Sequence, residues 1–195
     1  MLRAVFLDRD GTLNVEKGYI CDIDAIELYP GAARAVRLLN DAGILAILVT
    51  NQTGAARGFY TIEHVHALNR RVAELLMREA GARLDGLYFC PHYTDGIVAE
   101  FTMVCDCRKP APGMILRAAR DFPDIDLAAS FVVGDKATDI TFARNAGCRG
   151  ILVRTGYGDQ VLVGEYQLLE AQPEKVCADI VEAVAYILSQ PQALA

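Results

Sequence analysis

The chain has 195 residues, of which 53% are hydrophobic and 23% charged, and its formal net charge is −6. This composition is typical of a globular protein and excludes a disordered or fibrous chain. The acidic balance argues against a nucleic-acid partner, and no apolar run approaches the ~20 residues of a membrane helix. With no signal-peptide pattern at the N-terminus, we expect one soluble, cytoplasmic, monomeric domain over residues 1–195 that has no membrane partner.

Short apolar runs alternate along the chain with longer segments of helical periodicity. The runs are rich in β-branched or aromatic residues and are followed by polar or glycine-containing turns, which indicates buried strands. The predicted strands are residues 4–7, 44–49, 87–89, 131–133 and 151–153. The predicted helices are residues 31–42, 62–80, 112–122, 139–146 and 176–189, and residues 91–114 are interpreted as an ordered loop. This alternation predicts a three-layer α/β fold, with a mostly parallel sheet between two layers of helices.

Three of the predicted strands run directly into polar residues. These polar segments are Asp8 to Thr12, Thr50 to Gln52 and Gly134 to Lys136. The carboxyl ends of parallel strands lie at one edge of the sheet, where active sites of such folds are found. We therefore expect several carboxylates and a hydroxyl group to meet at that edge.

The chemistry of these residues favours phosphoryl transfer. Asp8 and Asp10 lie so close in sequence that their charges require a cation or a shared proton, and a third carboxylate, Asp135, makes Mg²⁺ the expected cation. Thr50 and Lys109 can hold phosphate oxygens. One aspartate can then attack phosphorus while the other protonates the leaving alcohol. The alternative is that the aspartates are ordinary turn or N-cap residues.

The segment Asp8-Arg9-Asp10-Gly11-Thr12-Leu13 resembles the first motif of the haloacid dehalogenase superfamily phosphatases. Thr50, Lys109 and Asp135 match the later motifs in the same order. The resemblance implies that Asp8 forms an aspartyl-phosphate, that Asp10 is the general acid and base, and that Thr50 and Lys109 hold the phosphoryl group. It also implies Mg²⁺ bound by Asp8, by the backbone carbonyl of Asp10 and by Asp135.

A second cluster of potential ligands lies in the predicted loop. It consists of Cys90, His92, Cys105 and Cys107. Four such ligands suit tetrahedral Zn²⁺, although the spacing within each pair is tighter than usual. No open ligand position is implied, so we predict a structural zinc that holds a loop of about residues 90–110 together. A disulfide or free thiols are the alternatives.

This cluster, followed by Arg108-Lys109-Pro110, resembles that of the D-glycero-D-manno-heptose-1,7-bisphosphate 7-phosphatases and of the related histidinol-phosphate phosphatases. Both are small members of the superfamily without a large cap domain. The resemblance implies removal of the 7-phosphate during synthesis of nucleotide-activated heptose for lipopolysaccharide or surface glycans. Histidinol phosphate is the alternative substrate, and a non-catalytic binding module on this scaffold is a further hypothesis.

The expected partner is thus a small phosphorylated sugar. A guanidinium can grip phosphate through two hydrogen bonds, so Arg108 is expected to hold the second phosphate. The other expected substrate contacts are Glu16, Lys17, Gly18, Tyr19, Asn51, Gln52, Thr53 and Lys136. Two roles stay open. Asp139 is either a neighbour of the metal or a helix N-terminal acid, and Arg57 is either a phosphate contact or a solvated loop residue.

Overall fold

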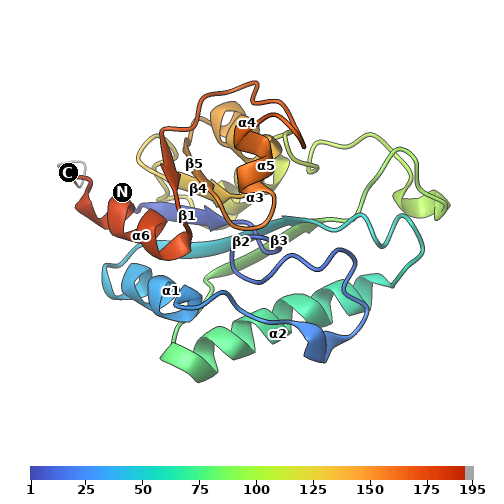
Figure 1. Ribbon diagram of the computed structural model, residues 1–195, viewed down its shortest axis with the longest axis horizontal. Helices are drawn as coiled ribbons and strands as arrows, with labels where there is room; N and C mark the ends of the chain where they lie inside the picture. The colour runs from blue at the N-terminus through green and yellow to red at the C-terminus, as the bar shows by residue number, and fades with distance from the viewer. Residues whose placement is uncertain (192–195) are drawn as a thin grey trace.

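The centre of the fold is a parallel sheet. In residues 1–191, which the computed structural model describes, the sheet has six strands in the order β3-β2-β1-β4-β5-β6, and every neighbouring pair is parallel. The strands are β1 (Ala4–Leu7), β2 (Leu45–Asn51), β3 (Gly86–Cys90), β4 (Phe131–Gly134), β5 (Arg149–Val153) and β6 (Lys175–Cys177). Figure 1 shows helices on both sides of it. The predicted three-layer α/β fold is confirmed.

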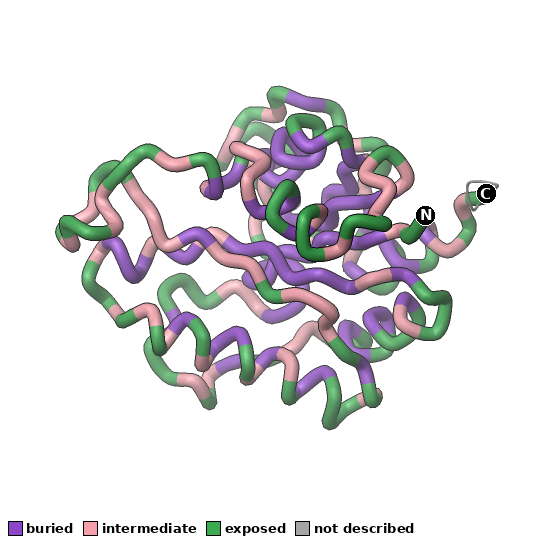
Figure 2. Tube along the Cα trace, turned by 180° about the vertical axis from the view of Figure 1, so that it is seen from behind, coloured by how far each residue is buried: buried purple, intermediate pink, exposed green. Residues whose placement is uncertain are grey.

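Each face of the sheet is covered by its own set of helices. The helices are α1 (Ala32–Asp41), α2 (Ile62–Ala80), α3 (Gly113–Asp121), α4 (Ala137–Ala146), α5 (Gly158–Leu162) and α6 (Ile180–Ser189). Val5 and Leu7 of β1 share one core with α1, α2 and α6, whereas Ala4 and Phe6 pack with α3 and α4. Side chains of a strand alternate between the two faces, so β1 is apolar throughout. Figure 2 shows the central strands as a buried layer.

The C-terminal part of the chain differs from the predicted elements. Strand β6 has only three residues, too few for a periodic pattern, and it forms because it pairs with β5. The predicted helix 176–189 therefore starts later, as α6, where the Asp179 side chain accepts a hydrogen bond from the backbone N–H of Glu182 (3.0 Å). In residues 1–191, no helix combines the length and the apolar character that crossing a membrane requires.

The strand order decides where the site lies. The chain builds outward from β1 to β3 on one side of the sheet and from β4 to β6 on the other. The connections that follow β1 and β4 therefore diverge, and they leave a crevice at the carboxyl ends of these two strands. Asp8 directly follows β1 and Asp135 directly follows β4. Residues 91–112, which connect β3 to α3, extend beyond the sheet in Figure 1.

Candidate active site

A buried lysine brings the strand-end carboxylates together. Lys109 Nζ donates to Asp8 Oδ1 (2.8 Å) and to Asp139 Oδ1 (2.7 Å). Burial favours the neutral amine, but the ion pairs with Asp139 and Asp8 raise the pKa of Lys109, so the ammonium form persists. Thr50 at the end of β2 lines the same small cavity as Asp8 and Lys109. The structure thus gathers residues as far apart in the sequence as Asp8 and Asp139, which are 131 positions apart.

Asn51 fixes the backbone of this lysine. Its side-chain Oδ1 accepts from the backbone N–H of Lys109 (3.1 Å), and its Nδ2 donates to the Lys109 carbonyl (3.3 Å). Asn51 was predicted as a substrate contact, and it does line the larger cavity described below. Its hydrogen bonds also tie the end of β2 to the loop that carries Lys109.

Three carboxylates form a group that fits a divalent cation. Oxygen atoms of Asp8, Asp135 and Asp139 all lie within 4.8 Å of one another. Asp135 Oδ2 accepts from the backbone N–H of Tyr157 (2.9 Å), whereas Oδ1 is buried without a hydrogen bond. Burial raises the pKa of Asp135 to about 8, and the charge of Asp8 adds to the rise. A hard cation such as Mg²⁺ would satisfy these oxygens.

Two glycines allow Asp135 its position. A Cβ atom on either Gly11 or Gly156 would overlap the Asp135 carboxylate, and both glycines have positive φ angles, +86° and +58°. Asp139 is engaged differently, because its second oxygen accepts from the backbone N–H of Lys136 (3.0 Å) at the start of α4. Both Asp139 oxygens are therefore already hydrogen-bonded by the chain, whereas Asp135 Oδ1 has no hydrogen bond and forms only an ion pair with Lys136 Nζ at 3.6 Å.

Asp10 is held by a buried arginine that the sequence reasoning missed. Arg9, 1% exposed, donates from Nε and Nη2 to the two oxygens of Asp10 (3.1 and 2.8 Å). It also donates to Asn69 of α2 and to Gln52, which directly follows β2 (3.0 Å each). Asn14 and Gln52 in turn donate to Asp10. Burial opposes ionisation of Asp10, but the charge and hydrogen bonds of Arg9 lower its pKa. The sequence offered one signal for this buried network, because Asn69 is a polar residue on the apolar face of α2.

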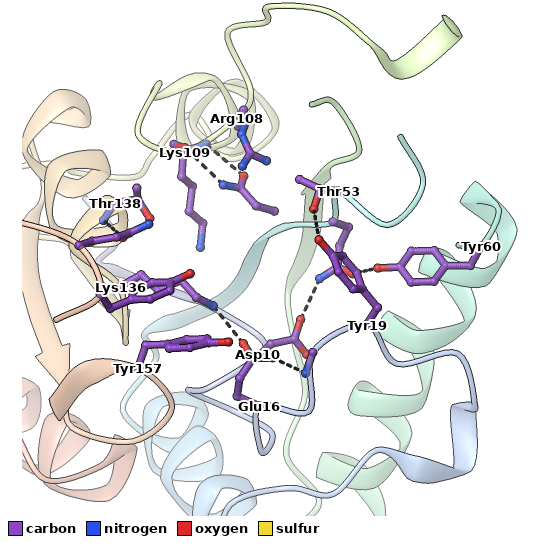
Figure 3. A pocket seen from close by; sticks show the side chains of 15 residues that line it. Asp10, Glu16, Tyr19, Thr53, Tyr60, Arg108, Lys109, Lys136, Thr138 and Tyr157 are labelled. Atoms are coloured by element: carbon purple, nitrogen blue, oxygen red, sulfur yellow. Dashed lines mark hydrogen bonds and ion pairs between the residues drawn. The ribbon is translucent and has the colours of Figure 1, made fainter. Parts of the chain in front are cut away.

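A cavity of about 260 Å³ opens beside these carboxylates (Figure 3). Of the predicted substrate contacts, Glu16, Gly18, Tyr19, Asn51, Gln52, Thr53, Arg108 and Lys136 line it. Lys17 does not: its Nζ donates to the Ala25 carbonyl and pairs with Glu27, both at 3.0 Å. The ion pair between Lys136 and Glu16 (3.2 Å) crosses one side of the cavity.

Five further residues of the lining were not predicted. They are Tyr60, Thr138, Tyr157, Tyr166 and Gln167. The Tyr60 hydroxyl donates to Gln52 Oε1 (3.1 Å). Three of the five come from the chain after β5, where no motif marks the sequence. Their approach to the site depends on how residues 154–174 run between β5 and β6.

The cysteine–histidine cluster brings four potential metal ligands together, with its sulfur atoms somewhat closer than they would stand around a zinc ion. The sulfur atoms of Cys90, Cys105 and Cys107 lie 3.0 to 3.6 Å apart, and His92 Nδ1 lies 3.6 Å from Cys90 and 3.3 Å from Cys107. Two thiolates on zinc stand about 3.8 Å apart at a Zn–S length of about 2.3 Å. The hydrogen bond between Cys90 and Cys107 lowers the pKa of Cys107 to about 5 and raises the pKa of Cys90, so the two thiols share one proton. Zinc would require both as thiolates and would displace that proton.

The cluster is also connected to the active-site cavity. Arg108 follows Cys107 directly, and its Nη1 donates to the carbonyl of His92 (3.3 Å). Its guanidinium stands 5.1 Å from the ring centre of Tyr93, and the guanidinium of Arg57 stands 4.3 Å from the same ring. Arg108 lines the cavity, whereas Arg57 is not among its lining residues.

Comparisons with known proteins agree with this geometry. A family model described as HAD-hydrolase-like matches residues 106–183. The D-glycero-D-manno-heptose-1,7-bisphosphate 7-phosphatase of Thermosynechococcus vestitus is 54% identical over 187 residues, 94% of each chain. The D-glycero-beta-D-manno-heptose-1,7-bisphosphate 7-phosphatase of Escherichia coli K12 is 47% identical over 155 residues, 78% of this chain and 80% of that protein.

Solved structures show the same likeness. The crystal structure of D,D-heptose 1,7-bisphosphate phosphatase from B. bronchiseptica, complexed with magnesium and phosphate, matches with a TM-score of 0.82 and 32% identity, over 96% of this chain and 98% of that one. The fold and the strand-end carboxylates are thus those of a phosphatase of the haloacid dehalogenase class. Within this class, the chain belongs to the family of the D-glycero-D-manno-heptose-1,7-bisphosphate 7-phosphatases.

Proposed function

We propose that this chain removes the 7-phosphate of D-glycero-D-manno-heptose 1,7-bisphosphate in the synthesis of nucleotide-activated heptose. The names of relatives at 54% and 47% identity support this substrate. The observation that best supports a substrate with two phosphates is the pair of adjacent cationic side chains at the cavity. Lys109 contacts Asp8, whereas Arg108 lines the cavity without contacting a carboxylate. A sugar with two phosphates can occupy both positions at once.

In the reaction, Asp8 is the nucleophile. Its carboxylate attacks the phosphorus of the 7-phosphate, so an Asp8–phosphorus bond forms while the bond to the sugar oxygen breaks. The leaving oxygen takes a proton from Asp10, which must carry that proton when the substrate is bound, although Arg9 lowers its pKa in the free protein. Asp10 later takes a proton from the water that hydrolyses the aspartyl-phosphate. Lys109 and the Thr50 hydroxyl stabilise the negative charge of the phosphoryl oxygens throughout.

Two metals complete the proposal. Asp8, the backbone carbonyl of Asp10 and Asp135 would hold Mg²⁺, which neutralises charge between the nucleophile and the phosphoryl group when bound. Cys90, His92, Cys105 and Cys107 would hold a structural Zn²⁺. We infer that the whole chain is a single monomeric domain, and its six unpaired cysteines favour a reducing compartment such as the cytoplasm.

The test is phosphate release from a panel of substrates. The panel contains both anomers of the heptose bisphosphate, histidinol phosphate and fructose 1,6-bisphosphate. We expect a heptose bisphosphate to be the preferred substrate, and Asp8→Asn to abolish turnover while circular dichroism and zinc content stay unchanged. Equal rates across the panel would contradict the assignment of heptose bisphosphate as the substrate. An Asp8→Asn turnover rate within tenfold of the wild type would rule out Asp8 as the nucleophile.

Arg108→Ala tests the second phosphate. A charge-assisted hydrogen bond contributes about 1.5–3 kcal/mol, so kcat/KM for the bisphosphate should fall about ten- to hundredfold. Activity on a small monophosphate should fall far less. Arg57→Ala is the matched control, because this guanidinium contacts the same Tyr93 ring without lining the cavity. Equal losses on both substrates would mean that Arg108 serves the transferred phosphate or the fold.

A further inference from the structure

We propose that Tyr157 and Tyr166 form an aromatic platform that determines specificity, by packing against the sugar portion of the substrate. This inference rests on the proposed function and concerns the part of the substrate remote from the transferred phosphate. The two rings are stacked, with their centres 4.1 Å apart and their planes 12° from parallel, and both line the cavity. Neither residue lies in a motif of the catalytic machinery.

Tyr157 is fixed relative to the catalytic groups. Its backbone N–H donates to Asp135 Oδ2 (2.9 Å), and Lys136 Nζ stands 5.1 Å from the centre of its ring. Figure 3 shows Tyr157 beside Lys136 and Glu16, across the cavity from Arg108. A substrate with one phosphate at Asp8 and another at Arg108 would place its carbon chain in the cavity that this ring lines.

Tyr166 is attached more loosely and is 42% exposed. It belongs to the segment between α5 and β6, whose neighbours Val163 and Leu168 are 68% and 78% exposed. Besides the stack, this segment is joined to the site by Gln167, whose Oε1 accepts from the backbone N–H of Thr138 (3.4 Å). The exposed part of the Tyr166 ring is thus free to gain contacts when a ligand enters.

The chemistry of the platform matches a sugar. Carbohydrates present faces of C–H groups flanked by hydroxyls, and an aromatic ring with a hydroxyl group offers an apolar surface together with a hydrogen-bonding end. The side-chain amide of Gln167 adds another polar group at the same wall. Binding cavities commonly combine such aromatic surface with a few polar groups. A compact monophosphate held at Asp8 would not extend to this wall.

The first experiment separates substrate contact from a structural role. Tyr166→Ala should raise KM for the heptose bisphosphate about tenfold, leave kcat within threefold, and lower kcat/KM for glycerol phosphate far less. Tyr166→Phe, which keeps the ring, should restore most of the affinity. Leu168→Ala, in the same exposed segment but outside the cavity lining, is the control. Equal losses on both substrates, or no change on either, would overturn the platform.

The second experiment observes the platform directly. The chain contains no tryptophan, so Tyr166→Trp introduces a single tryptophan, whose emission can be excited selectively over that of the tyrosines. In the inactive Asp8→Asn background, heptose bisphosphate should change its emission saturably, whereas inorganic phosphate alone should not. If the bisphosphate does not change the tryptophan emission although the unmodified enzyme hydrolyses it, the platform is wrong and the proposed function stands. If the unmodified enzyme releases no phosphate from the bisphosphate, the proposed function fails, and the platform with it.

Discussion

Replacing Arg9 by methionine should be strongly destabilising, although Arg9 is proposed to touch neither substrate nor metal. Arg9 is 1% exposed and places two of its nitrogen atoms on the two oxygens of Asp10. Methionine fills part of the volume but leaves the Asp10 carboxylate without its countercharge. Asn69 Oδ1 also loses its donor. The variant therefore converts a satisfied buried network into one with unpaired groups.

The expected magnitude follows from the burial of this pair. Breaking a buried ion pair by removing one partner costs about 3–5 kcal/mol. For a chain of this length, that corresponds to a melting temperature about 6–20 °C lower. Asn14 and Gln52 still donate to Asp10, which favours the lower part of the range. Because Arg9 lowers the pKa of Asp10, this stabilisation is present above the ordinary aspartate pKa and is lost as the pH falls through the lowered value.

The assay is urea unfolding at pH 7, followed by far-ultraviolet circular dichroism, on a double-mutant cycle. The variants are Arg9→Met, Asp10→Asn and the double substitution. The double variant has no unpaired charge, so its loss of unfolding free energy should be about 1–3 kcal/mol smaller than the sum of the two single losses. Arg9→Lys keeps the positive charge but lacks the planar guanidinium that binds both Asp10 oxygens. Its unfolding free energy should therefore lie between those of Arg9→Met and the wild type. Losses that add within about 0.5 kcal/mol would refute the coupling.

Three other predictions concern the metal sites. The purified protein should contain about one zinc per chain by elemental analysis. The Cys107→Ser variant should lose this zinc and melt at a lower temperature. Wild-type protein that lacks zinc without ever having been exposed to a chelator would contradict the prediction. Mg²⁺ should raise the melting temperature of the wild type but not of Asp135→Asn, and an equal rise in both would place binding elsewhere. Gly156→Ala should abolish the Mg²⁺-dependent rise, because its Cβ would displace the Asp135 carboxylate. Gly147→Ala is the control and should retain the rise, because its φ is also positive but its Cβ would meet nothing within 4 Å. Loss of the rise in both variants would indicate backbone strain alone.

Local patterns in the sequence were sufficient for the fold class and for the centre of the site. Apolar runs such as residues 4–7 and 131–133, each followed by a polar turn, favour strands buried on both faces, and the carboxyl ends of parallel strands lie at one edge of the sheet. Asp8, Thr50 and Asp135 therefore meet because of where their strands end. The cluster of Cys90, His92, Cys105 and Cys107 was predicted from its side-chain chemistry, and the end of β3 and the loop after it bring the four side chains together.

The tertiary structure alone decided where side chains point and which groups contact the buried ones. The partners of Arg9 include Asn69, sixty positions away, and Lys17 turns to Glu27 although its neighbours Glu16 and Gly18 line the cavity. Tyr157 reaches the cavity through its backbone hydrogen bond to Asp135, and Tyr166 reaches it from the segment between α5 and β6. Such contacts join segments with no common local period, so no spacing in the sequence encodes them, and they form only when the whole sheet is in place.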